Sequence, residues 1–301
     1  MKPIVRIAGY TGAGIALIVI VAAIAIPSLS DRKQTRQVGI PLPSITFASD
    51  PQALERGKYL FETRSCASCH GEDGGGGTVI GNPDDGDLYV RAPSIAPGGI
   101  ASGYRDADWV RLLRHGVKPA GTPVLVMPSE DYSRLTDADV GAVATYVRSL
   151  APMPAVAATM KLPFMAKALY VAGGIPDAAE KIDHSLPPPS AVPEGVTPEY
   201  GAYVGALCVG CHGSGLSGGR VPGTPPSWPP AANITTAPDS SMQHYPSTEQ
   251  FRAMMRSGKR PDGSKISTVM PVDSFARMSD LELDALFTFL KKAPPRTTGT
   301  R

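Results

Sequence analysis

Four cysteines stand out in this sequence because they form two short motifs, each followed at once by a histidine. Residues 66–70 read Cys-Ala-Ser-Cys-His and residues 208–212 read Cys-Val-Gly-Cys-His, which uses every cysteine of the chain. Two thiols at this spacing can form thioether bonds with the vinyl groups of a haem, and the histidine that follows can bind its iron. The motifs therefore predict two haem c groups. The residues concerned are Cys66, Cys69, Cys208 and Cys211 for covalent attachment, and His70 and His212 for the iron.

A Cys-x-x-Cys pair has two other common uses, as a disulfide bond and as one half of a zinc site. Zinc would require the two cysteine pairs to be brought together around one ion. Each pair instead lies inside its own copy of a longer repeat, and a histidine follows each pair directly. The haem interpretation is therefore favoured over both alternatives.

The similarity between the two halves of the chain extends well beyond the cysteines. Residues 114–121 align with residues 256–263 at an offset of 142, and a Met-Pro pair then recurs at an offset of 143. Ahead of the motifs, Gly57, Tyr59 and Leu60 have the counterparts Gly201, Tyr203 and Val204. Self-similarity of this kind predicts two copies of one small module.

The second axial ligand of each iron is predicted to be a methionine. Met127 follows His70 at almost the same separation along the chain as Met270 follows His212. The proline after each methionine favours an extended loop, and a thioether ligand raises the reduction potential of haem iron. His115 is the rival ligand in the first copy, although the second copy has a serine at the matching position.

The elements that must position these residues are predicted to be helices, in the same order in both copies. Asp50 and Pro51 form a cap and first turn for a helix ahead of the first motif. A middle helix begins near Asp106 in one copy and near Ser247 in the other, with apolar residues on one side.

A last helix follows in each copy. In the second copy, Ser279-x-x-Glu282 has the pattern of a capping box, and apolar residues then recur at helical spacing. Strand-like alternation of polar and apolar residues is nearly absent from the chain. The sequence therefore predicts an all-α fold.

A single transmembrane helix is predicted near the N-terminus. The segment from Ile7 to Ile26 contains no charged residue, and as a helix it is long enough to span a hydrocarbon core. A cleaved signal peptide is the competing interpretation, but the apolar core of a signal peptide is shorter, at about 7 to 15 residues. Basic residues flank the segment at both ends, so the positive-inside rule does not settle its orientation.

Four segments are expected along the chain. They are residues 1–36 as membrane anchor and stalk, 37–152 as the first module, 153–195 as a Pro/Ala-rich linker, and 196–301 as the second module. The formal net charge is +2, and the first 36 residues hold five basic residues and one acidic residue, so the remainder carries −2. A part so nearly neutral has no basic surface for nucleic acid.

Taken together, these stretches resemble the membrane-anchored dihaem cytochrome c family and are similar to the cytochrome c subunits of bacterial periplasmic alcohol and related dehydrogenases. The resemblance covers residues 50–152 and 198–293. It implies two tandem cytochrome c domains with an N-terminal transmembrane helix in the cell inner membrane, and with both domains on the periplasmic side. Many of the alcohol dehydrogenase subunits have a third haem domain, for which this sequence has no motif.

The function that the resemblance implies is a relay of single electrons in a respiratory chain. A dehydrogenase is the implied donor, and a terminal oxidase or a soluble cytochrome is the implied acceptor; no catalytic residue is predicted. The alternative is a dihaem redox enzyme such as a peroxidase or a thiosulfate dehydrogenase. Such an enzyme generally needs an open iron position, and two methionine candidates argue against one. A subunit that mainly tethers a partner to the membrane is a third class.

Overall fold

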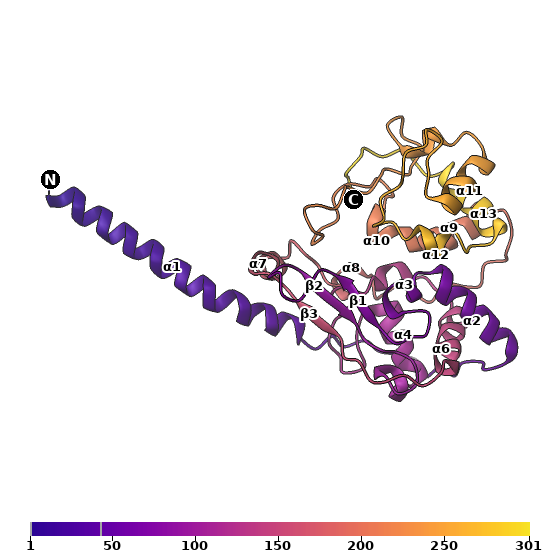
Figure 1. The fold of residues 1–301 in the computed structure, drawn as a ribbon, viewed down its shortest axis with the longest axis horizontal. Helices are drawn as coiled ribbons and strands as arrows, with labels where there is room; N and C mark the ends of the chain where they lie inside the picture. Colours follow the sequence, from indigo (N-terminus) through magenta and orange to yellow (C-terminus); the bar gives the residue numbers. More distant parts are fainter. Residues whose placement is uncertain (1, 43) are drawn as a thin grey trace.

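The computed structural model describes residues 2–42 and 44–301, with side chains from residue 10 onward. Figure 1 shows a long N-terminal helix that projects from a head made of two lobes. The first lobe contains the first cysteine motif and the second lobe contains the second motif. The two copies of the sequence repeat therefore fold as two neighbouring units.

The projecting helix is α1 (Lys2–Gln34). Within the part from Tyr10 to Gln34, a stretch of 18 residues has a mean hydropathy of 2.5. None of these 18 residues is buried by the rest of the chain. By length and composition, α1 is the one helix in the described part of the chain that could cross a membrane. The flanking charges Lys2 and Arg6 have side chains that lie outside the described residues.

The first lobe is built from short helices around one apolar core. Its elements are α2 (Pro51–Thr63), α3 (Cys66–His70), β1 (Gly77–Ile80), β2 (Tyr89–Ala92), η1 (Ile100–Gly103), α4 (Asp106–His115), α5 (Ser129–Tyr132) and α6 (Asp137–Ser149). Asp50 caps α2 as predicted, since its carboxylate accepts from the Ala53 N–H at 2.8 Å. The core gathers apolar side chains from α2, α4 and α6, among them Leu60, Trp109 and Val140.

The segment after α6 packs back onto the first lobe. It contains β3 (Thr159–Lys161), α7 (Phe164–Val171) and α8 (Ala178–Lys181). β3 pairs with β2, which pairs with β1, so that three short strands form one antiparallel sheet. The mainly helical fold is confirmed, and this small sheet is an addition that the sequence did not predict.

The second lobe repeats the helices of the first. Its elements are α9 (Pro198–Gly205), η2 (Ala206–Cys208), α10 (Val209–His212), η3 (Ser241–His244), α11 (Thr248–Ser257), α12 (Val272–Phe275) and α13 (Asp280–Leu290). Its core lies between α9, α11 and α13 and includes Tyr200, Phe251 and Leu286. Each lobe therefore has its own core, as expected of a domain.

A glycine allows the first and last helices of each domain to cross closely. A Cβ atom on Gly57 of α2 would lie 1.9 Å from the carbonyl oxygen of Ala142 in α6. A Cβ atom on Gly201 of α9 would lie 2.0 Å from the carbonyl oxygen of Ala285 in α13. The two glycines are counterparts in the sequence repeat, so both domains use the same crossing.

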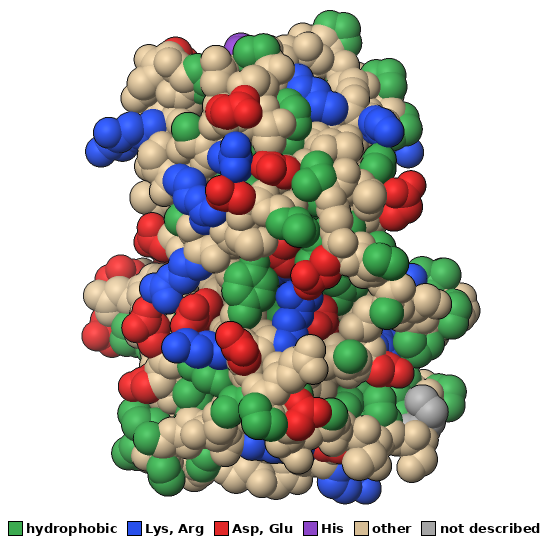
Figure 2. All heavy atoms as spheres, turned by 90° about the vertical axis from the view of Figure 1, so that its right-hand side faces the viewer, with side chains coloured by type: hydrophobic (Ala, Val, Ile, Leu, Met, Phe, Trp, Pro, Cys, Tyr) green, Lys and Arg blue, Asp and Glu red, His purple; other side chains and the backbone are tan. Residues whose placement is uncertain are grey.

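The face of the head opposite the anchor carries charges of both signs. Figure 2 shows Lys and Arg side chains interspersed with Asp and Glu side chains over both lobes on this face. Such mixing leaves no broad field of one sign there that would steer a charged partner from a distance.

Candidate haem sites

Each cysteine motif forms a short helix that orients its histidine. In α3, the Nδ1 atom of His70 lies 3.0 Å from the carbonyl oxygen of Pro93. In α10, the Nδ1 atom of His212 lies 2.7 Å from the carbonyl oxygen of Ala232. A carbonyl oxygen can only accept, so Nδ1 carries the hydrogen and Nε2 keeps its lone pair. Both rings therefore have the tautomer that a metal ligand needs.

The electrostatic surroundings favour the neutral form of both rings. Burial lowers the pKa of His70 and of His212 below the ordinary value of 6.5, which outweighs the opposite effect of the hydrogen bonds to Pro93 and Ala232. A neutral imidazole is the form that binds a metal.

The two methionine candidates lie in the same local structure. Pro128 has φ −80° and ψ 64°, and Pro271 has φ −77° and ψ 63°. In each case the residue after proline donates its N–H to the methionine carbonyl oxygen at 2.8 Å. These are inverse γ-turns, and they present Met127 and Met270 in matching ways.

The side chains of each site gather on one core. Cys66 and Met127 both pack against the core of the first domain, and Cys208 and Met270 both pack against the core of the second. None of the four cysteines forms a disulfide bond. The described residues contain no group of three or more His, Cys, Asp or Glu side chains that could hold a metal ion. This donor set, two thiols with a neutral imidazole and a thioether, fits haem c and does not fit a zinc site.

One buried donor also fits a bound group in the first domain. Trp109 is only 4% exposed, and its indole N–H is buried without a hydrogen-bond partner. An unpaired buried donor is costly, and a carboxylate of a bound haem is an acceptor that could satisfy it. Phe251 occupies the matching position in the second domain and has no such donor.

The rival ligand His115 is engaged elsewhere. Its Nδ1 atom lies 3.1 Å from the Nδ1 atom of His184 in the segment between the domains. His184 lies beyond the sequence repeat, so this pairing could not be predicted from the repeat. Next to His115, Arg114 binds Asp137 at 2.8 Å, and the counterpart pair Arg256 and Asp280 lies at 2.8 Å. The repeated arginines therefore tie the middle helix to the last helix of each domain.

The two domains meet through contacts that repeat with the sequence. Tyr59 of α2 donates to Glu282 of α13 at 2.7 Å, and its counterpart Tyr203 of α9 donates to Asp139 of α6. Each tyrosine oxygen also accepts from a backbone N–H at the start of the last helix of the other domain. These donors are Ser279 at 2.9 Å and Thr136 at 3.3 Å. Glu282 and Asp139 are repeat counterparts as well, so the domains are related by an approximate two-fold axis.

The same symmetry places each cysteine motif against the other domain. Ser68, within the first motif, lies 3.0 Å from Ser274 of α12, oxygen to oxygen. Gly210, within the second motif, donates its N–H to Asp131 of α5 at 2.6 Å. Since α5 and α12 follow Met127-Pro128 and Met270-Pro271, each motif touches the helix that follows the candidate methionine of the other domain.

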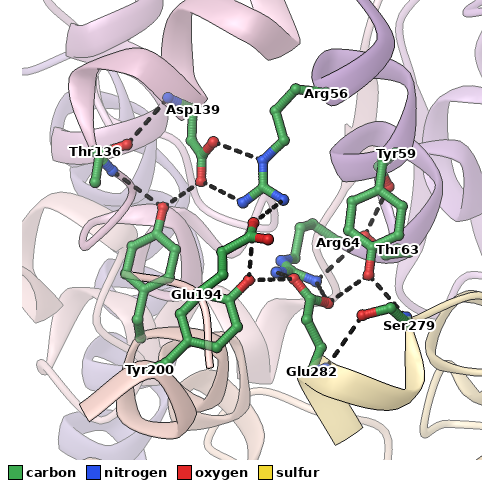
Figure 3. A network of polar contacts seen from close by, with 11 residues as sticks. Arg56, Tyr59, Thr63, Arg64, Thr136, Asp139, Glu194, Tyr200, Ser279 and Glu282 are labelled. Carbon is green, nitrogen blue, oxygen red and sulfur yellow. Dashed lines mark hydrogen bonds and ion pairs between the residues drawn. The ribbon is translucent and has the colours of Figure 1, made fainter. Parts of the chain in front are cut away.

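One buried ion pair breaks this symmetry. Arg64 donates to both carboxylate oxygens of Glu282, at 2.7 and 3.0 Å, and the two side chains are 4% and 2% exposed. Tyr200 also points its hydroxyl toward Glu282, at 3.4 Å. Figure 3 shows these groups converging from both domains on one carboxylate. The second domain has Ala206 at the position that matches Arg64.

The interface also explains why the predicted capping box is only half formed. The Ser279 side chain accepts from the Glu282 N–H at 3.1 Å, as a cap should. The Glu282 carboxylate does not return to Ser279, because Arg64 and Tyr59 bind it instead. The capping-box pattern predicted a local hydrogen bond for Glu282, whereas the structure shows contacts with Arg64 and Tyr59 of the other domain.

Comparison with known proteins identifies the class. The family model described as Cytochrome c matches residues 54–151 and 200–294. The matched parts make up more than half of the chain, and the chain belongs to the cytochrome c family. It carries two haem c groups, one in each domain.

Curated relatives are cytochrome subunits of larger assemblies. The fructose dehydrogenase cytochrome subunit of Gluconobacter japonicus is 27% identical over 272 residues, which is 81% of this chain and 53% of that protein. The Cbb3-type cytochrome c oxidase subunit CcoP of Helicobacter pylori (strain 52) is 30% identical over 37% of this chain and 33% of its own length. The cytochrome c subunit of alcohol dehydrogenase (quinone) from Gluconobacter oxydans (strain 621H) is 34% identical over 30% of this chain and 20% of its own length. The chain thus spans about half the length of the first relative and less of the others.

Proposed function

We propose that this chain is a membrane-anchored electron relay that takes single electrons from a dehydrogenase and passes them to a terminal oxidase or a soluble cytochrome. The observation that carries the proposal is the pair of matched sites, which use the same residue types and the same local turns and lie on a shared interface. Two such sites in one head suit transfer better than turnover of a substrate, since both offer the same set of iron and haem ligands in the same local turns.

The proposed roles of the site residues follow from their chemistry. Cys66 and Cys69 would attach one haem and Cys208 and Cys211 the other, through thioether bonds. The iron ligands would be His70 with Met127 and His212 with Met270. Each bound haem would supply one reversible ferric–ferrous electron at a potential set by its ligands and burial.

The chain itself prepares the ligands. The carbonyl oxygens of Pro93 and Ala232 fix the ring orientation of the two histidines and keep Nε2 available. The γ-turns at Pro128 and Pro271 fix the backbone of the two methionines. The polar contacts between the domains then hold the two sites at a constant separation.

The partners and the location rest on the anchor and on the relatives. α1 is long and apolar enough to hold the head at a membrane. We place the head on the periplasmic side of the cell inner membrane, where family members receive haem. The fructose and alcohol dehydrogenase relatives support a dehydrogenase as donor, and the oxidase relative supports an oxidase as acceptor.

A spectrum and redox titration of the detergent-purified chain tests the proposal. We expect two covalently held haems per chain and a methionine-to-iron absorption feature near the red end of the spectrum. Met127→Ala and Met270→Ala should each remove about half of this feature, because each removes one of two equivalent ligands, and the double variant should remove all of it. Met160→Ala serves as the control, since Met160 lies on β3 outside both cores.

Three results would count against the proposal. Retention of the absorption feature in the double variant would show that the axial ligands are misassigned. A chain that binds zinc, or that forms two disulfides and no haem adduct, would exclude the haem assignment. Turnover of hydrogen peroxide or thiosulfate without an added dehydrogenase would identify the chain as an enzyme.

A further inference from the structure

Helix α7 is fixed against the end of the anchor. Lys33 of α1 donates to the carbonyl oxygen of Tyr170 at 2.8 Å, and Arg36 binds the carboxylate of Asp177 just beyond α7. Tyr170 itself is fully buried and donates to Asp177 at 2.8 Å. Figure 1 shows α7 at the corner of the head that lies nearest to the anchor. The position of α7 relative to α1 is therefore set by several charged and polar contacts.

The opposite side of α7 is apolar and uncovered. Phe164, Met165 and Leu169 are 48%, 66% and 44% exposed. At 3.6 residues per turn, these three side chains fall within a sector of about 140°. Lys167 is the one charged residue of the helix. Single exposed apolar side chains are ordinary, but three on one short helix beside an apolar anchor form a patch.

The depth of this patch follows from the length of α1. The apolar segment expected to span the membrane ends at Ile26, just before Pro27, and Lys33 lies about two helical turns further on, which is about 10 Å along a helix. The headgroup layer on each side of a bilayer is roughly 5 to 8 Å thick. The contact between Lys33 and Tyr170 therefore lies at the outer edge of the headgroups when α1 spans a membrane. An interfacial helix buries its apolar face by about 5 to 10 Å at this level.

We propose that α7 is a second membrane contact, in which Phe164, Met165 and Leu169 insert into the lipid interface beside α1. This inference rests on the proposed membrane anchor. The ammonium group of Lys167 reaches lipid phosphates from the same helix while its alkyl chain stays among apolar groups. The occupant of the patch is lipid rather than a protein, because α1 itself brings lipid to this corner of the head.

The contact of α7 with the membrane would fix the tilt of the head relative to the membrane plane. A single helix leaves the head free to rotate about its axis and to rock at the end of the stalk. A second contact beside α1 removes this freedom and gives the two haem sites a constant height and direction above the membrane. Partners in the same membrane would then always meet the same face of the head.

Spin-label accessibility in lipid nanodiscs tests this inference on the full haem-loaded chain. Met165→Cys introduces one free thiol for a nitroxide, since the native cysteines are held by haem. The readout compares collisions with oxygen, which concentrates in lipid, and with a water-soluble nickel chelate. Ile18→Cys, in the middle of α1, reports on the anchor. Val196→Cys is the matched control, because Val196 is 54% exposed and lies two residues before α9, in the second domain rather than beside the anchor.

We expect the label at 165 to prefer oxygen, at a shallower depth than the label at 18, and the label at 196 to prefer nickel. The preference for oxygen at 165 should be lost when Phe164→Ser and Leu169→Ser are added. A nickel preference at 165 with an oxygen preference at 18 would refute the inference and leave the anchor intact. A nickel preference at both positions would refute the anchor itself. Shielding of position 165 from both reagents would show a protein contact instead and would also overturn the inference.

Discussion

At the level of single residues, Glu282 is a carboxylate buried between the two domains. It is 1% exposed and accepts hydrogen bonds from Arg64 and Tyr59, which belong to the other domain. Burial of a charge is costly unless the charge is paired and hydrogen-bonded. Here both conditions are met, but only while the domains are docked, because the partners of the carboxylate lie in the other domain.

Glu282→Gln should lower the free energy of unfolding by about 3 kcal/mol or more, because it leaves the buried Arg64 guanidinium without a counter-charge. Denaturant unfolding of the haem-loaded chain measures this change. Glu72→Gln is the matched control, since it removes another cross-domain ion pair, which Glu72 makes with Arg277 at 2.8 Å. This pair is exposed, because 75% of the Glu72 side chain and 47% of the Arg277 side chain are accessible to solvent. The control should cost at most about 1 kcal/mol. Equal losses in the two variants would contradict the importance of burial.

At this level, the sequence predicts local chemistry well and distant chemistry poorly. The residues proposed to hold the haems could be selected from the sequence because their types and spacing are local and occur twice. The role of Glu282 could not, because its partner Tyr59 lies in the other half of the chain and the local pattern around Ser279 already suggested a different use. The repetition of Tyr59 as Tyr203 was the available signal, but it does not specify which group each hydroxyl meets.

At the level of elements, each domain depends on the crossing of its first and last helices. Gly57 and Gly201 allow this crossing because a hydrogen stands where a methyl group would meet a carbonyl oxygen. The crossing also places Tyr59 and Tyr203 on the outer side of the helix pair, where the other domain begins. Helix packing inside a domain and docking between domains are thus coupled through residues two positions apart.

Gly57→Ala should destabilise the first domain by about 1 to 3 kcal/mol, because the added methyl group forces α2 and α6 apart. The measurement is thermal unfolding followed by helical circular dichroism. Gly103→Ala is the control, since a Cβ atom on Gly103 meets no atom within 4 Å. A variant at Gly57 that unfolds at the same temperature as the control would show that the crossing has more room than the structure indicates.

The helices were predictable because capping residues and apolar periodicity are strong local signals. Asp50, Ser247 and Ser279 each begin a helix as expected. The three strands were not predictable, because each has only three or four residues, too few to establish a pattern. β3 in addition comes from the segment that was expected to be a linker, so the sheet exists only through a tertiary contact.

At the level of the whole molecule, acid should weaken the docking of the domains. Burial alone raises the pKa of Glu282 and of Asp139, but nearby arginine side chains and hydrogen bonds lower it by more, to below the ordinary values of 4.5 and 3.8. A carboxyl group with a lowered pKa stabilises the folded state above its ordinary pKa and loses this effect as the pH falls through its folded-state pKa. The docked state should thus be stable near neutrality and should weaken below a pH of about 4.5.

Small-angle scattering and denaturant unfolding as a function of pH measure this effect, through the radius of gyration and the free energy of unfolding. The Glu282→Gln variant should show a shallower pH dependence, because it has lost one of the titrating groups. An identical acid profile in the variant and the wild type would contradict the assignment of the titration to this interface. The mutual arrangement of the domains itself could not be predicted, since a repeat reveals two copies but not the faces on which they meet.

The connection between the domains determines how strong this interface needs to be. Because β3, α7 and α8 are fixed to the first domain, only the short segment 182–197 leads from α8 to α9. A tether this short keeps the second domain at an effective concentration on the order of millimolar. The two domains therefore stay docked even if their interface would be too weak to hold two separate molecules together in dilute solution. A single proteolytic cut within 182–197 would make their association depend on protein concentration.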